Sequence, residues 1–153
     1  MAAIANPFDP KTVVLAKHAQ HVVLVHFPIA LFLTAVAFDF AAQRTKSVAF
    51  AIVARYNFMI AAVATVPVLI SGLLAWRWQL EGHKLKGVLL QHLVLGAASS
   101  LLIWVVWLIH SRAARRRDGS LPAYRLVIEM LGALMVALTA HLGGFLSGVN
   151  VPG

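Results

Sequence analysis

The segment VLLQHLVLGAASSLLIWVVWLI, residues 88–109, decides the fold, because it contains no Asp, Glu, Lys or Arg. A helix needs about 20 consecutive, mainly apolar residues to cross the hydrocarbon core of a bilayer. Only a histidine, a glutamine and two serines interrupt the apolar character of this segment. The segment therefore predicts a membrane-spanning helix.

Three further segments have the same character, at about Val22 to Phe40, Phe58 to Trp76 and Leu126 to Leu146. Short polar connections separate the four segments, and short connections make consecutive helices antiparallel neighbours. The sequence thus predicts an all-α, four-helix transmembrane bundle with up-down-up-down topology. We expect one domain over residues 1–153, with residues 1–20 as an N-terminal tail or interfacial segment.

The composition supports this prediction and excludes several functions. The chain is 61% hydrophobic and only 12% charged, whereas soluble domains carry about 25% charged residues. The net charge of +8 does not indicate nucleic-acid binding, because apolar runs interrupt the basic residues and no basic stripe forms. The absence of cysteine excludes disulfides, thiolate-bound iron–sulfur clusters and covalently attached c-type haem.

The distribution of Lys and Arg predicts the orientation. The first and third connections, with the adjoining helix ends, carry Arg44, Lys46, Arg55, Arg112, Arg115, Arg116, Arg117 and Arg125. The other side carries Lys11, Lys17, Arg77, Lys84 and Lys86. Cytoplasmic loops are enriched in these residues. We therefore expect a multi-pass protein of the bacterial inner membrane, with both termini in the periplasm and with membrane lipid as a partner.

The chain has seven histidines, and only His110 falls on the predicted inner side. The others are His18, His21, His26, His83, His92 and His141. Three of them lie inside three different predicted spans, each about five residues from the outer end, which is roughly 7 Å deep at 1.5 Å per residue. His26, His92 and His141 are therefore predicted to converge at one level of the bundle.

Ionisable residues inside a membrane are functional candidates, and neutral imidazole binds haem iron, copper or zinc. Gly96 follows His92 by four residues and Gly144 follows His141 by three, and such small residues favour a wide, flat porphyrin beside the ligand. The same glycines also allow close helix packing without a cofactor, and histidines also form interhelical hydrogen bonds. Arg77 lies on the predicted outer side, where it either neutralises haem propionates or flanks the membrane.

These observations favour a b-type haem protein that acts as a membrane electron-transfer subunit. Two of His26, His92 and His141 are the predicted axial ligands, with His21 as a fourth candidate. Because the inner side offers only His110, we expect a single redox centre near the outer face. The alternatives are a copper or zinc site formed by His26, His92 and His141, and a structural anchor without any cofactor.

The predicted subunit needs no catalytic residues of its own, and it would exchange electrons with quinol or with a periplasmic redox protein. It could also belong to a larger respiratory complex. The remaining ionisable residues have structural interpretations. Arg125 and Glu129 are spaced to pair on one helix face, Asp39 lies near Arg44, and His110 is expected to be an interfacial or packing residue.

Two end motifs also carry a resemblance to a known family. The segment HVVLVHFPIAL, residues 21–31, resembles the opening of a bacterial membrane family called domain of unknown function 2231. The segment AHLGGFL, residues 140–146, followed by GVNV, residues 148–151, resembles the closing motif of that family. The resemblance implies four membrane helices and a shared set of histidines. Some relatives carry Rieske iron–sulfur modules, which favours electron transfer.

Overall fold

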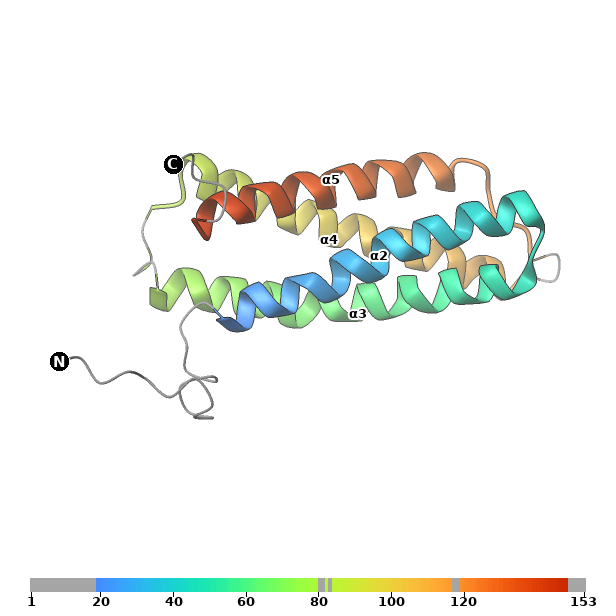
Figure 1. Ribbon diagram of the computed structural model, residues 1–153, viewed down its shortest axis with the longest axis horizontal. Coiled ribbons are helices and arrows are strands. Elements are labelled where there is room, and N and C mark those ends of the chain that lie inside the picture. Colours follow the sequence, from blue (N-terminus) through green and yellow to red (C-terminus); the bar gives the residue numbers. More distant parts are fainter. Residues whose placement is uncertain (1–18, 80–81, 83, 117–118, 149–153) are drawn as a thin grey trace.

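Four long helices build the protein in a computed structural model, which describes residues 19–79, 82, 84–116 and 119–148. They are α2 (Ala19–Thr45), α3 (Val48–Gln79), α4 (Gly87–Ala114) and α5 (Arg125–Leu146). The helices lie side by side, and consecutive helices run in opposite directions (Figure 1). The predicted four-helix, up-down-up-down bundle is thus confirmed.

All four helices are long and apolar enough to cross a membrane. Even the shortest candidate span, Arg125–Leu146 with 22 residues, extends about 33 Å at 1.5 Å per residue, which matches a hydrocarbon core of about 30 Å. Large apolar side chains are exposed along every helix, including Val63, Leu101 and Leu134. Contact with lipid accounts for that exposure, since soluble monomers rarely expose large contiguous apolar patches.

The two ends of the bundle differ in their charged and titratable residues. One end holds the α2–α3 and α4–α5 connections, and we call it the arginine end after Arg44, Arg55, Arg112, Arg115 and Arg125. The opposite end holds the start of α2 and α4 and the end of α3 and α5. We call it the histidine end after His21, His26, His92 and His141. His18, His83 and most of the predicted N-terminal tail lie outside the described residues.

Close packing of small and aromatic residues forms the core. The rings of Phe32 and Phe58 meet with centroids 5.5 Å apart. Gly132 of α5 lets α2 approach, since a Cβ atom at Gly132 would lie only 2.8 Å from Phe32 Cζ. Alanines and small aliphatic residues fill the remaining core: Ala35, Ala54, Ala61, Ala62, Ile103, Val106 and Val136.

Burial is uneven along the bundle axis. The fully buried side chains lie in the middle and toward the arginine end. Among the described residues of the histidine end, only Pro28 is buried, and the residues of α3 from Val66 to Trp78 are half-buried or exposed. The helices are therefore tightly packed at one end and more loosely packed at the other.

The helices extend past the predicted spans because a hydropathy pattern marks only the apolar part of a helix. α2 continues through Arg44 to Thr45, and α4 continues through Arg112 to Ala114. Trp104 lies ten residues before the end of α4. In the longer helix its indole N–H donates to Thr65 Oγ1 at 3.0 Å inside the bundle.

Candidate functional site

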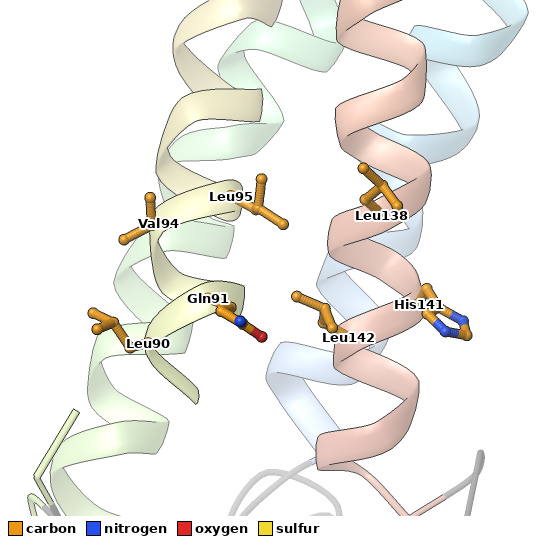
Figure 2. Close-up of a pocket in the computed structure, with 7 residues that line it drawn as sticks. All are labelled: Leu90, Gln91, Val94, Leu95, Leu138, His141 and Leu142. Atoms are coloured by element: carbon orange, nitrogen blue, oxygen red, sulfur yellow. The ribbon is translucent and has the colours of Figure 1, made fainter. Parts of the chain in front are cut away.

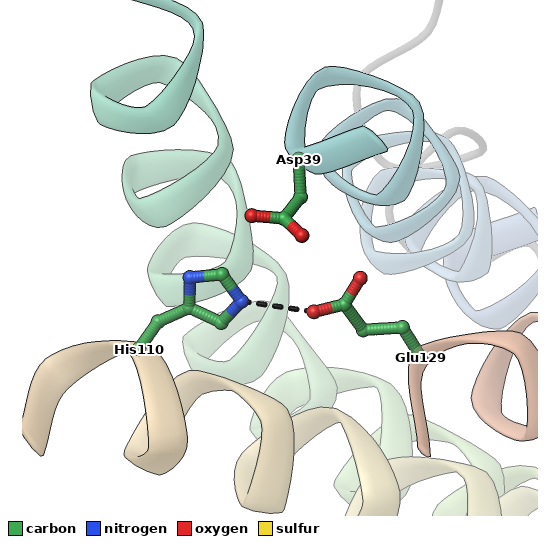
Figure 3. A group of neighbouring side chains, drawn as sticks. All are labelled: Asp39, His110 and Glu129. Carbon is green, nitrogen blue, oxygen red and sulfur yellow. Dashed lines mark hydrogen bonds and ion pairs between the residues drawn. The ribbon is translucent and has the colours of Figure 1, made fainter. Parts of the chain in front are cut away.

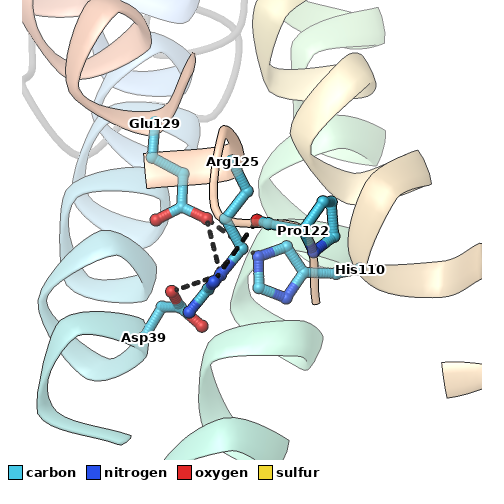
Figure 4. Close-up of polar contacts among 5 residues, drawn as sticks. All are labelled: Asp39, His110, Pro122, Arg125 and Glu129. Carbon is cyan, nitrogen blue, oxygen red and sulfur yellow. Dashed lines mark hydrogen bonds and ion pairs between the residues drawn. The ribbon is translucent and has the colours of Figure 1, made fainter. Parts of the chain in front are cut away.

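Four ionisable side chains from three helices are buried together at the arginine end (Figure 4). Arg125 Nε of α5 donates to Asp39 Oδ2 of α2 at 3.0 Å and lies 3.9 Å from Glu129 Oε1. His110 Nε2 of α4 lies 2.9 Å from the same Glu129 oxygen. The exposed fractions are 0% for Glu129, 1% for Asp39, 4% for His110 and 7% for Arg125. Burial of the Asp39 carboxylate is tolerable because the Arg125 guanidinium pairs with it.

Asp39, His110 and Glu129 have the composition of a metal site. One ligand atom from each lies within 4.8 Å of the others, and the three side chains face one another (Figure 3). The Arg125 guanidinium, however, lies between the two carboxylates. Because this cation already occupies the position that a metal ion would take, we interpret the group as an ion-pair network.

At the histidine end, His92 of α4 points into the bundle toward α5. Its Nδ1 lies 3.1 Å from the Thr139 carbonyl oxygen. A carbonyl can only accept, so Nδ1 carries the hydrogen in this contact. A Cβ atom at Gly143 would lie 3.2 Å from His92 Cε1. The glycine therefore provides the space in which the imidazole lies against α5.

His21 of α2 has an equivalent environment on α3. Its Nδ1 lies 3.0 Å from Ser71 Oγ, while the Ser71 hydroxyl donates its own hydrogen to the Val68 carbonyl at 2.9 Å. Ser71 Oγ is therefore the acceptor, and His21 Nδ1–H is the donor. A Cβ atom at Gly72 would lie 2.9 Å from His21 Cε1, so this imidazole also lies against a glycine.

These two histidines share one arrangement. Each is half-buried, and each packs its imidazole against a glycine of the neighbouring helix. Because each Nδ1–H is donated to a neighbouring helix, each neutral imidazole keeps its lone pair on Nε2. An imidazole whose second nitrogen donates in this way is held in the orientation and tautomer of a metal ligand.

The other two candidate histidines lie on exposed faces. His26 is exposed, and its Nδ1 donates to the Val22 carbonyl of its own helix. His141 is exposed and meets Phe145 edge to face, with ring centroids 5.0 Å apart. Figure 2 shows the His141 imidazole on the side of α5 away from α4. The structure therefore turns His21 and His92 against neighbouring helices, whereas His26 and His141 are exposed.

The remaining predicted site residues are Gly96, Gly144 and Arg77. A Cβ atom at Gly96 would lie 3.6 Å from Thr139 Cγ2, so this glycine supports close packing of α4 on α5. Gly144 is half-buried on α5, and Arg77 is exposed in the last turn of α3.

A mainly apolar groove of about 510 Å³ opens between α4 and α5 (Figure 2). Its lining is Leu90, Gln91, Val94, Leu95, Leu138, His141 and Leu142.

Sequence reasoning missed the network at the arginine end. It predicted the proximity of Arg125 to Glu129, which is confirmed, but it placed Asp39 near Arg44. The closest partner of Asp39 is Arg125, and the Arg44 guanidinium lies over the Phe40 ring instead. The sequence feature that could have predicted this network is that Asp39 and Glu129 lie at similar depth near the same end of their spans.

Comparison with known proteins identifies a family. A family model described as "Predicted membrane protein (DUF2231)" matches residues 17–150, and these residues include all four helices. No curated protein and no solved structure matches the chain.

Proposed function

Because the chain belongs to the DUF2231 family of predicted membrane proteins, we propose a function inside the bilayer: it is an electron-transfer subunit that binds haem b through His21 and His92. One observation carries this proposal. Both imidazoles donate Nδ1–H to a neighbouring helix, His21 to Ser71 and His92 to Thr139. Both therefore keep Nε2, which would hold the haem iron.

The number of donors favours haem over a bare ion. A structural zinc ion takes about four protein ligands, and a catalytic zinc site about three. Haem iron needs only two axial ligands from the protein, because the porphyrin supplies the rest. Among the described residues, no group of three metal-binding side chains forms at the histidine end. The pair His21 and His92 supplies the two protein ligands that haem iron requires.

The surroundings fit the same ligand. The loose packing of the histidine end leaves both imidazoles partly accessible. Positive charge at this end comes from Arg77, exposed at the end of α3, and from Lys84 and Lys86, exposed before α4. These cations would pair with haem propionates, which would otherwise be buried without a partner. When bound, haem iron would accept and release single electrons. The residues of the chain orient the ligands, limit access of water and neutralise the propionates.

We propose that this site lies near the periplasmic face of the bacterial inner membrane, with both termini on that side, because the arginines gather at the opposite end of the bundle and cytoplasmic segments are enriched in Lys and Arg. Quinol or a periplasmic redox protein could then reach it, and a larger respiratory complex could contain it. The apolar groove between α4 and α5 opens on the lipid-facing surface, from which a quinol would approach. In this account the chain transfers electrons and performs no catalysis of its own.

A reduced-minus-oxidised absorption spectrum of protein purified from haem-replete cells tests the proposal. We expect the α-band of a six-coordinate haem b in the unmodified protein. His21→Ala and His92→Ala should abolish that band. His26→Ala and His141→Ala are matched controls, since they remove exposed histidines from the same end, and they should retain it.

Two results would overturn the proposal. The first is a folded, haem-replete preparation without a haem band. Metal analysis of that sample would then separate a copper or zinc protein from a cofactor-free anchor. The second is a band that survives both His21→Ala and His92→Ala. Loss of the band in His26→Ala and His141→Ala instead would move the ligands to the exposed histidines.

A further inference from the structure

The network at the arginine end has an unequal number of charges. Asp39 and Glu129 contribute two negative charges, Arg125 contributes one positive charge, and a neutral His110 contributes none. A net charge of about −1 buried at the end of a membrane bundle is costly, because an uncompensated ion loses its hydration on burial. One additional proton would neutralise the group.

The hydrogen bonds indicate where that proton binds. Asp39 receives the Arg125 Nε–H bond at 3.0 Å, so its negative charge is directly compensated. Glu129 Oε1 receives the His110 contact at 2.9 Å, while Arg125 Nε lies farther away at 3.9 Å. Glu129 Oε2 is buried and has no hydrogen-bond partner among the described residues. An unpaired carboxylate oxygen is more costly to bury than an unpaired hydroxyl.

We propose that Glu129 is a buried proton-binding site, which holds an exchangeable proton on Oε2 and is a carboxylic acid when the network is at rest. In this state neutral His110 donates Nε2–H to Glu129 Oε1, and Arg125 compensates Asp39. The whole group is then neutral. Release of the proton leaves a carboxylate that Arg125 and His110 can still partly stabilise.

Every element around Glu129 contributes to this balance. α2 supplies Asp39, α4 supplies His110, and α5 supplies Arg125 and Glu129 itself. α3 supplies the Phe58 ring, whose centroid lies 4.7 Å from that of His110. The site lies about 6 Å from the start of α5, since Glu129 is four residues after Arg125 and each residue adds 1.5 Å. A proton from the aqueous phase at the arginine end therefore has only one helical turn to travel.

Infrared spectroscopy can observe this proton on a single residue. The chain has only two glutamates, Glu81 and Glu129, so Glu129 is the sole glutamate of the Glu81→Gln variant. Protein of this variant, labelled with 13C-glutamate and reconstituted in liposomes, reports on Glu129 alone. We expect an isotope-shifted carboxylic-acid C=O band at neutral pH, replaced by a carboxylate band as the pH rises.

Two variants sharpen the test. Asp39→Asn removes one negative charge, so the network no longer needs the extra proton, and the Glu129 carboxylic-acid band should disappear at lower pH than before. Glu129→Gln mimics the neutral side chain and should therefore fold, with a stability that no longer falls as the pH is raised. A carboxylate band from Glu129 at every pH at which the protein is folded would overturn the proposal. An Asp39→Asn variant whose band titrates unchanged would contradict its charge balance.

Discussion

The two ends of the bundle bury titratable side chains in opposite ways. At the arginine end, Asp39, His110, Arg125 and Glu129 are almost inaccessible, and their contacts join α2, α4 and α5 to one another. At the histidine end, His21 and His92 are half-buried, and each donates one nitrogen to a neighbouring helix. The polar groups of the arginine end contact one another, whereas the histidine end keeps an Nε2 lone pair on each of two imidazoles.

This difference indicates a division of roles. Polar groups that are buried and mutually paired hold helices together, and removing one member leaves a buried charge without compensation. Polar groups that are oriented but retain a lone pair are suited to bind a ligand. We therefore expect substitutions at the arginine end to affect folding, and substitutions at the histidine end to affect ligand binding.

Arg125→Met should give the largest loss of stability. It leaves the buried Asp39 carboxylate without its cation, and breaking a buried pair costs about 3–5 kcal/mol in the free energy of unfolding. Denaturation in detergent by SDS titration measures this change. Arg44→Met is the control, because Arg44 is exposed, and its effect should stay within about 0.5 kcal/mol. Equal losses for both variants would remove the distinction between the buried network and the exposed arginines.

Alanine substitutions at Gly132 and Gly96 test whether the helices pack more tightly in one part of the bundle than in another. In Gly132→Ala the new Cβ atom would lie 2.8 Å from Phe32 Cζ, and overpacking of this kind costs about 1–3 kcal/mol. In Gly96→Ala the nearest atom would lie at an ordinary 3.6 Å, so higher helix propensity could stabilise the protein by up to about 1 kcal/mol. Opposite signs in the same unfolding assay are expected. Two losses of equal size would contradict the account of looser packing.

Ser71→Ala should weaken haem binding while the fold is preserved. It removes the acceptor for His21 Nδ1–H, and loss of such an orienting partner lowers the affinity of a metal site about 10-fold or more. Titration of haem into haem-depleted protein measures the affinity. Ser147→Ala is the control, because Ser147 is exposed at the same end and donates to the nearby Gly144 carbonyl. Indistinguishable affinities for the two variants would argue against His21 as a ligand.

We expect Arg77→Gln to have the smallest effect, a small decrease in the affinity for haem. Arg77 is exposed at the end of α3, and exposed ion pairs contribute about 0–1 kcal/mol. The affinity for haem should therefore fall by no more than about five-fold, and the difference from the unmodified protein should shrink at high salt. A loss as large as that of Ser71→Ala would show that Arg77 has a more central role than propionate neutralisation.

The sequence predicted the spans, their order and the gathering of histidines at one end, because hydropathy and depth depend only on position along the chain. It did not predict which face of each helix turns inward. His21 and His26 are five residues apart, which rotates one about 140° from the other around the helix axis. Nearly uniform apolarity around α2 leaves that rotation undetermined, so depth alone favoured His26 over His21.

The same limit explains the missed ion pair. Asp39 and Arg125 are 86 positions apart in the chain, and nothing in the spacing of either residue identifies the other. Arg44 was the nearer candidate in sequence, but its guanidinium lies over the Phe40 ring at 4.8 Å. The pairing depends on how α5 packs against α2, which a pattern within one helix does not contain.

Carbon monoxide binding to the reduced protein tests whether His21 and His92 ligate the haem together, because an iron that holds two histidine ligands would have no position for an added ligand. We expect carbon monoxide to leave the spectrum of the unmodified protein unchanged. We expect any haem retained by His21→Ala or His92→Ala to bind carbon monoxide readily. A spectrum of the unmodified protein that shifts at once on addition of carbon monoxide would contradict joint ligation by His21 and His92.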